Sequence, residues 1–216
     1  MMLFGVFWAA FAPLLLLAAW AGLAWLLRRL APARFGWRGA LLLAAIVLGA
    51  PLGWIWRQDS AAFQAVCRAE GATNIREKAQ ADGILLTSGT SNSFGMRYLH
   101  SEGFAWMESN DIYKRGGFVR YARNDKGEIT TTKIDAPTAR YEVREIFERQ
   151  PNVGISRTLV LERESGRELA RGSSLSFDGG RLKWVFGAWG VGQCPNARTD
   201  PAAFNAWYHL AKNTLR

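Results

Sequence analysis

The sequence predicts an α+β protein in which an N-terminal two-helix transmembrane hairpin is followed by one antiparallel β-rich domain. Two observations support this prediction. All 18 acidic residues of the 216-residue chain follow position 56, and two long uncharged stretches precede it. After that position, short aromatic-rich segments are bounded by Gly, Asn or Asp, which is typical of strands. We therefore divide the chain into a membrane hairpin, residues 1–56, and an α+β domain, residues 57–216.

Each uncharged stretch has about the length of a membrane span. Residues 3–27 and residues 39–56 contain no charged side chain. An α-helix needs roughly 20 apolar residues to cross a hydrocarbon core of about 30 Å. The first stretch lacks both the basic start and the short apolar core of a cleavable signal peptide. We expect two helices that remain in the membrane.

The loop between the spans, residues 28–38, predicts their orientation. It carries four arginines and no acidic residue: Arg28, Arg29, Arg34 and Arg38. Basic loops stay on the cytoplasmic side, so both ends of the hairpin should face outward. The chain has no N-x-S/T site and is rich in Arg and Ala, which fits a bacterium with a GC-rich genome. We expect a multi-pass inner-membrane protein whose C-terminal domain lies in the periplasm.

The two cysteines, Cys67 and Cys194, lie near the two ends of the polar domain. An oxidising compartment lets such thiols pair. A disulfide would then clamp the termini of the domain together, and closing so long a loop stabilises a fold by roughly 4–5 kcal/mol. The alternative is two unrelated buried thiols. Neither cysteine has the spacing of a zinc or thioredoxin-like site.

Local patterns predict the elements of the domain in order. A short leading helix should begin at Ser60 and end near Gly71. Aromatic-rich segments predict strands at residues 83–89, 96–109, 116–123 and 179–190, and a hairpin at residues 157–177. Asp200 as N-cap and Pro201 as first helical residue predict a C-terminal helix. Its apolar face, which should pack on the sheet, comprises Phe204, Trp207, Tyr208, Ala211 and Leu215.

The sequence offers little that predicts catalysis. With two histidines, His100 and His209, a three-histidine metal site is excluded, and the chain has no phosphate-binding or hydrolase motif. We expect no metal, cofactor or enzyme activity. The one arrangement of interest is His100 and Glu102, which would share a face of a strand at 96–109 and could serve a hydrolase. Its nucleophile would have to come from the preceding loop, from Ser91 or Ser93.

Charge and aromatic residues indicate partners. The polar domain has 23 basic residues, the 27 of the chain less the four loop arginines, against 18 acidic ones. This excess favours anionic lipid headgroups, and less so nucleic acid. However, the charges mostly alternate in sign, which is typical of solvated strand faces. The aromatic residues Trp184, Phe186 and Trp189 would pack beneath the C-terminal helix or form an exposed surface for a protein partner.

The sequence as a whole predicts a non-catalytic accessory or assembly subunit of a bacterial cell-envelope complex, of the secretion, pilus-assembly, respiratory or transport type. Its spans would contact other integral membrane proteins, since Gly49 and Gly53 have the spacing of a helix-packing motif. A lipid- or ligand-binding domain is the alternative, and it would require an apolar cavity between sheet and helix. A membrane-anchored hydrolase that uses His100 and Glu102 is the third hypothesis.

Overall fold

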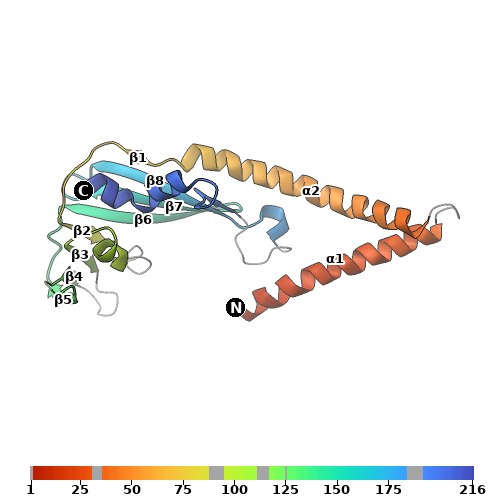
Figure 1. The fold of residues 1–216 in the computed structure, drawn as a ribbon, viewed down its shortest axis with the longest axis horizontal. Coiled ribbons are helices and arrows are strands. Elements are labelled where there is room, and N and C mark those ends of the chain that lie inside the picture. The colour runs from red at the N-terminus through yellow and green to blue at the C-terminus, as the bar shows by residue number, and fades with distance from the viewer. Residues whose placement is uncertain (1, 31–35, 88–94, 111–116, 125, 184–191) are drawn as a thin grey trace. The chain divides into compact units, whose positions relative to one another are not determined.

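A computed structural model describes residues 2–30, 36–87, 95–110, 117–124, 126–183 and 192–216 (Figure 1). The chain forms two compact units. The first comprises residues 1–66, 149–154 and 176–193, and the second comprises residues 67–148, 155–175 and 194–216. The protein is of the mixed α+β class, with a large sheet and several helices, as the sequence predicts.

The first unit contains α1 (Met2–Leu30) and most of α2 (Trp37–Glu70). Of the helices in the described part of the chain, one, α2, is long and apolar enough to cross a membrane by length and composition. At 34 residues it is about 51 Å long. The predicted helix start at Ser60 is wrong, because the helix continues through this position. Nothing in the stretch from Arg57 to Ser60 breaks a helix, since it contains neither Gly nor Pro.

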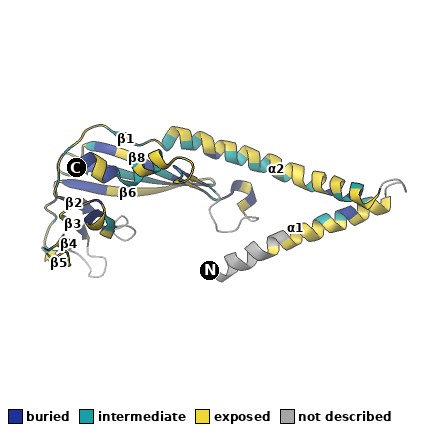
Figure 2. Cartoon of the chain, viewed as in Figure 1, coloured by how far each residue is buried: buried dark blue, intermediate teal, exposed yellow. Residues whose placement is uncertain are grey.

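The surface of α2 is apolar and exposed over its N-terminal half, and Figure 2 shows the exposed residues along the helix. Leu42, Ile46 and Trp54 expose 66%, 60% and 63% of their surface. Among the described residues up to Trp54, the buried ones on the two helices are small: Ala24, Ala40 and Ala44. Farther along α2 the large side chain of Phe63 is buried as well, at 4% exposure. In the apolar part of α2, exposed side chains are therefore large and the buried ones are small.

A nine-stranded sheet has the order β1-β8-β7-β6-β2-β3-β4-β5, with β9 paired to β8. The strands are β1 (Asn74–Ile75), β2 (Gly83–Leu86), β3 (Trp106–Asn110), β4 (Phe118–Arg123), β5 (Ile129–Ile134), β6 (Tyr141–Gln150), β7 (Val153–Glu162), β8 (Glu168–Phe177) and β9 (Gly192–Cys194). The predicted hairpin at residues 157–177 is confirmed as the end of β7 and all of β8. Gly166 in its turn has φ 66°, a left-handed conformation that favours glycine.

The prediction of an antiparallel sheet is wrong at β2, which runs parallel to both of its neighbours. Gly83 pairs with Trp106 of β3, and Leu86 pairs with Val143 of β6. Parallel neighbours need a crossover connection. The link from β2 to β3 contains a short helix over residues 95–100, in the segment that the aromatic pattern predicted as strand. Because this helix was predicted as a strand, the crossover from β2 to β3 was not predicted, and neither was their parallel pairing.

The C-terminal helix begins as predicted, because the Asp200 carboxylate accepts a hydrogen bond from the Ala203 N–H at 3.1 Å. It is interrupted at His209, which separates α5 (Pro201–Tyr208) from α6 (Leu210–Leu215). Ala211 and Leu215 are buried, whereas the other residues of the predicted face are half-buried. The apolar cluster that joins α6 to the sheet includes Ile84, Leu86, Val143, Leu169, Leu210 and Leu215. These side chains occupy the space where a ligand-binding domain would need its cavity.

The predicted strand at residues 179–190 is wrong at its start, where the structure has a 3₁₀-helix, Gly180–Leu182. Gly179 and Gly180 both have positive φ, at 96° and 61°, which suits a tight turn rather than a strand. The predicted partner residues Trp184, Phe186 and Trp189 lie outside the described residues, as does Arg34.

Candidate functional site

The structure joins Cys67 and Cys194 in a disulfide, as the sequence prediction requires. Cys67 lies near the end of α2 and Cys194 ends β9. Gly71 closes the helix beside the bond, and its N–H donates to the Cys67 carbonyl at 2.8 Å. A Cβ at position 71 would lie 2.9 Å from the Cys194 sulfur and 2.6 Å from the Cys67 oxygen, so only glycine fits there. The disulfide therefore links residues 127 positions apart within the second unit.

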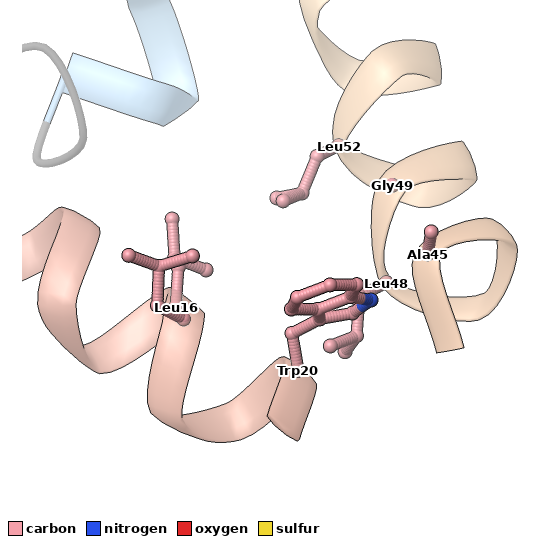
Figure 3. Close-up of a pocket in the computed structure, with 7 residues that line it drawn as sticks. Leu16, Trp20, Ala45, Leu48, Gly49 and Leu52 are labelled. Carbon is pink, nitrogen blue, oxygen red and sulfur yellow. The ribbon is translucent and has the colours of Figure 1, made fainter. Parts of the chain in front are cut away.

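An apolar groove lies between α1 and α2, with a volume of about 580 Å³ (Figure 3). Seven residues line it: Leu16, Leu17, Trp20, Ala45, Leu48, Gly49 and Leu52. Figure 3 shows the Trp20 ring facing α2 across the groove. Its indole N–H donates to the Leu41 carbonyl at 3.2 Å, so the polar atom of the ring is satisfied. The groove can take an aliphatic chain or the side chains of another helix, but it offers no charge to a polar ligand.

Small residues open one face of α2 beside this groove. Ala45, Gly49 and Gly53 follow one another at intervals of four and therefore lie on one face of the helix. Apart from the adjacent residues and the backbone of α2 itself, no described atom lies within 4 Å of a Cβ placed on Gly49 or Gly53. Such a face allows the backbone of a second helix to approach closely.

The arginines that predicted the orientation lie at the facing ends of the two helices. Arg28 and Arg29 belong to the last turn of α1, and Arg38 to the first turn of α2. The Arg29 guanidinium lies 5.1 Å from the centroid of the Trp25 ring. Arg and Trp at the end of an apolar helix are typical of the membrane–water interface.

The predicted pairing of His100 with Glu102 is wrong. Residues 95–100 are helical, so the strand alternation that would place both side chains on one face does not exist. His100 is exposed, and its Nδ1 lies 2.8 Å from a guanidinium nitrogen of Arg123. Glu102 is buried, and the histidine that faces it is His209, whose Nδ1 lies 3.6 Å from Glu102 Oε1. Spacing could not reveal this contact, because the two residues are brought together only when the C-terminal helices pack.

The Glu102 centre consists of Glu102, Arg97, His209 and the tyrosines around them. Arg97 Nε lies 3.2 Å from Glu102 Oε1, and its guanidinium lies 4.9 Å and 4.0 Å from the ring centroids of Tyr98 and Tyr208. Burial raises the pKa of Glu102, and the charges of Arg97 and His209 cancel only part of this effect. Burial also raises the pKa of Tyr98 to about 12. Since 1% of Glu102 is exposed, its carboxyl offers no face to a substrate.

A second buried carboxylate, Glu108 on β3, is held differently. Its Oε2 accepts hydrogen bonds from the backbone N–H groups of Thr138 and Ala139 at 2.8 Å and 2.9 Å. Its Oε1 accepts from Arg120 at 2.6 Å and from the Thr138 hydroxyl at 2.9 Å. Burial alone would raise the pKa of Glu108, but these hydrogen bonds outweigh burial and lower it. Local sequence patterns do not reveal this site, because its partners lie 12 to 31 residues away along the chain.

No protein-family model, curated protein or solved structure matches this chain. The function therefore has to be inferred from the exposure and chemistry of the sites described above. The two buried glutamates are enclosed by protein, whereas the groove and the small-residue face are open. The open surfaces are the ones that suit contact with another molecule.

Proposed function

We propose that this protein is a non-catalytic, membrane-anchored accessory subunit of a bacterial cell-envelope complex. In this proposal α1 and α2 form a transmembrane hairpin, and the disulfide-clamped α+β domain lies in the periplasm. The exposed apolar surface of α2 is the observation that carries the proposal. Water-soluble proteins rarely expose apolar patches larger than a few hundred Å². Leu42, Ile46, Val47 and Trp54 are all 49% to 66% exposed on one uncharged stretch, which a hydrocarbon environment would solvate.

The ends of the helices support the hairpin. Trp25 and Trp37 expose 55% and 48% of their surface near the arginines of the connecting loop. Indole rings favour the level of the lipid headgroups, and basic residues favour the cytoplasmic side. An oxidising compartment would favour the bond between Cys67 and Cys194. Both arguments lead to the same orientation, with the loop inside and the domain outside.

The groove between the helices and the small-residue face support docking onto another integral membrane protein. Lipid chains are as apolar as leucine, so helices in a bilayer associate through close packing rather than through the hydrophobic effect. Gly49 and Gly53 leave room for such packing. The excess of basic residues in the domain would in addition favour the anionic headgroups nearby.

Thiol labelling tests the anchoring and the orientation. Spheroplasts that express the full chain are treated with a membrane-impermeant maleimide, with and without prior reduction. We expect Cys67 and Cys194 to react only after reduction. A Gly36→Cys variant, with its new thiol in the loop between the helices, is the matched control and should react only after lysis. Reaction of Cys67 and Cys194 only after lysis would place the domain in the cytoplasm and overturn the proposed orientation.

Photo-crosslinking tests the accessory role. Benzoylphenylalanine at Leu52, which lines the groove, should give an adduct with an integral membrane protein identified by mass spectrometry. The same residue at Val47, which is exposed but does not line the groove, should not. Gly49→Leu narrows the groove and should abolish the Leu52 adduct. An adduct with lipid alone, insensitive to Gly49→Leu, would contradict the accessory role while leaving the anchor in place.

A further inference from the structure

Among the described residues, one edge of β6 is paired only at the start of the strand. The strand lies between β7 and β2, but β2 pairs with it only at Glu142 and Val143. From Arg144 onward, the described residues place no strand beside this edge. An open edge presents a row of backbone donors and acceptors that favour pairing with another strand.

The side chains along this edge are unusual for a solvated strand. Phe147 is 68% exposed and Ile146 is 37% exposed. Both lie between charged residues, and the five positions read Arg144, Glu145, Ile146, Phe147 and Glu148. Proteins usually protect a free edge with charges, prolines or bulges, rather than with adjacent exposed apolar residues.

We propose that this segment, residues 144–148, binds the same segment of a second copy of the chain. The two strands would run antiparallel about a two-fold axis at Ile146. In this register Ile146 lies opposite Ile146 of the other copy. Arg144 lies opposite Glu148, and the two-fold axis repeats this pair. On the other face Phe147 lies opposite Glu145, with the two Phe147 rings diagonal to each other and within reach.

The charges are complementary in this register, and each one also has an intrachain partner of opposite sign. The Arg144 guanidinium binds the Glu142 carboxylate at 2.9 Å, and Glu148 binds Arg157 at 2.5 Å. Arg144 and Glu148 remain 46% exposed, so each can take a second partner. Pairing two copies would create the alternating series Glu142, Arg144, Glu148 and Arg157, in which the last two residues come from the other copy.

Both neighbouring registers lose the two Arg144–Glu148 pairs. Moving the two-fold axis back by one residue would in addition place the two Glu145 carboxylates opposite each other, and like charges in that position destabilise a strand pair. Moving it forward by one residue would place Arg144 opposite the uncharged Gln150 and Glu148 opposite Ile146. The inference concerns the second unit and does not depend on the membrane anchor.

Site-specific crosslinking tests the register. The full chain with Ile146→Cys is purified in detergent and oxidised, and dimers are counted on a non-reducing gel. The register places the two introduced thiols opposite each other, at a distance that a disulfide spans. Thr131→Cys, on the exposed edge strand β5, is the matched control. We expect the Ile146→Cys dimer to form roughly tenfold faster than the control.

Charge reversal tests the partner. In the Ile146→Cys background, Arg144→Glu places Glu opposite Glu148, and Glu148→Arg places Arg opposite Arg144. Each variant alone should crosslink roughly tenfold more slowly. A mixture of the two, carrying different tags, should form the mixed dimer at about the original rate, because both charge pairs are then attractive. Misfolding of either variant cannot produce this recovery.

Four results would overturn the inference: crosslinking at Ile146 no faster than at Thr131, single reversals without effect, a mixture that does not recover, or an adduct with a different protein in place of the dimer. The last result would assign the edge of β6 to another chain.

Discussion

Glu102 and Glu108 are six residues apart in the sequence, and both are buried, with 1% and 0% of their surface exposed. They differ in what surrounds the carboxylate. Glu108 accepts hydrogen bonds from two backbone N–H groups, a hydroxyl and a guanidinium. Glu102 has the Arg97 guanidinium at 3.2 Å and the His209 imidazole at 3.6 Å, and hydrogen bonding from the Lys212 backbone and from His209 lowers its pKa by less than burial raises it.

This difference shows that nearby positive charge does not by itself stabilise a buried carboxylate in its ionised form. Burial raises the pKa of Glu102 although Arg97 and His209 are adjacent, whereas burial is overcome at Glu108 and the pKa falls. At Glu108 the hydrogen bonds from two backbone N–H groups, a guanidinium and a hydroxyl together outweigh burial, whereas at Glu102 the two cations and the Lys212 backbone do not. Glu108 therefore holds Thr138 and Ala139, which precede β6, against β3.

The largest effect is expected from Glu108→Ala. The substitution leaves the Arg120 guanidinium and two backbone N–H groups without their acceptor. Removing one partner of a buried ion pair costs about 3–5 kcal/mol. We expect the free energy of unfolding to fall by this amount. Urea unfolding of the full chain in detergent, followed by pulse proteolysis, measures it.

Glu164→Ala is the control for this measurement. Glu164 is exposed in the turn between β7 and β8, and its removal should change the free energy of unfolding by less than about 0.5 kcal/mol. Equal losses for the two variants would mean that the hydrogen bonds to Glu108 do not anchor the fold.

A smaller effect is expected from Glu102→Gln. The amide keeps the shape of the side chain, and it removes a charge that burial disfavours, so the free energy of unfolding at pH 7 should change by less than about 1 kcal/mol. Glu108→Gln is the matched variant and should cost about 2–3 kcal/mol, because charged hydrogen bonds are lost. If the two amide variants were equally destabilised, the two carboxylates would be equivalent and the comparison would fail.

Short sequence patterns predicted those features of the fold that depend on a few adjacent residues. Asp200 and Pro201 marked the start of α5, and Gly166 marked the turn of the hairpin, because a cap and a positive φ are properties of a few adjacent residues. The helix over residues 95–100 was missed because its aromatic and apolar residues also alternate as in a strand. Without this helix the sequence predicted no crossover after β2, and therefore no parallel pairing of β2.

The surroundings of the two glutamates could not be predicted in this way. Glu102 meets His209 across 107 positions, and Glu108 meets Ala139 across 31. Such contacts depend on how the elements pack, which no spacing within one element encodes. The two cysteines were an exception, because a chain with only two of them allows one intrachain pairing.

The smallest effect, and the one that most directly separates the two glutamates, is the pH dependence of stability. The pKa of Glu108 is lower in the folded state than in the unfolded state, where it is about 4.3. Its contribution is therefore present above pH 4.3 and is lost as the pH falls through the folded-state pKa. The pKa of Glu102 is raised on folding, so its contribution is present below pH 4.3 and is lost as the pH rises through the folded-state pKa.

The difference in unfolding free energy between wild type and each Gln variant should consequently change with pH in opposite directions. The loss caused by Glu108→Gln should stay constant from pH 7 down to about pH 4.3 and shrink below it. Glu102→Gln should become less favourable relative to wild type as the pH falls from 7, because protonation of Glu102 then removes the buried charge from the wild-type protein. His209 faces Glu102 together with Arg97 and Tyr98, so both variants are also measured with His209→Gln. Slopes of the same sign in that background would mean that one environment governs both carboxylates, and that the backbone donors to Glu108 do not distinguish it from Glu102.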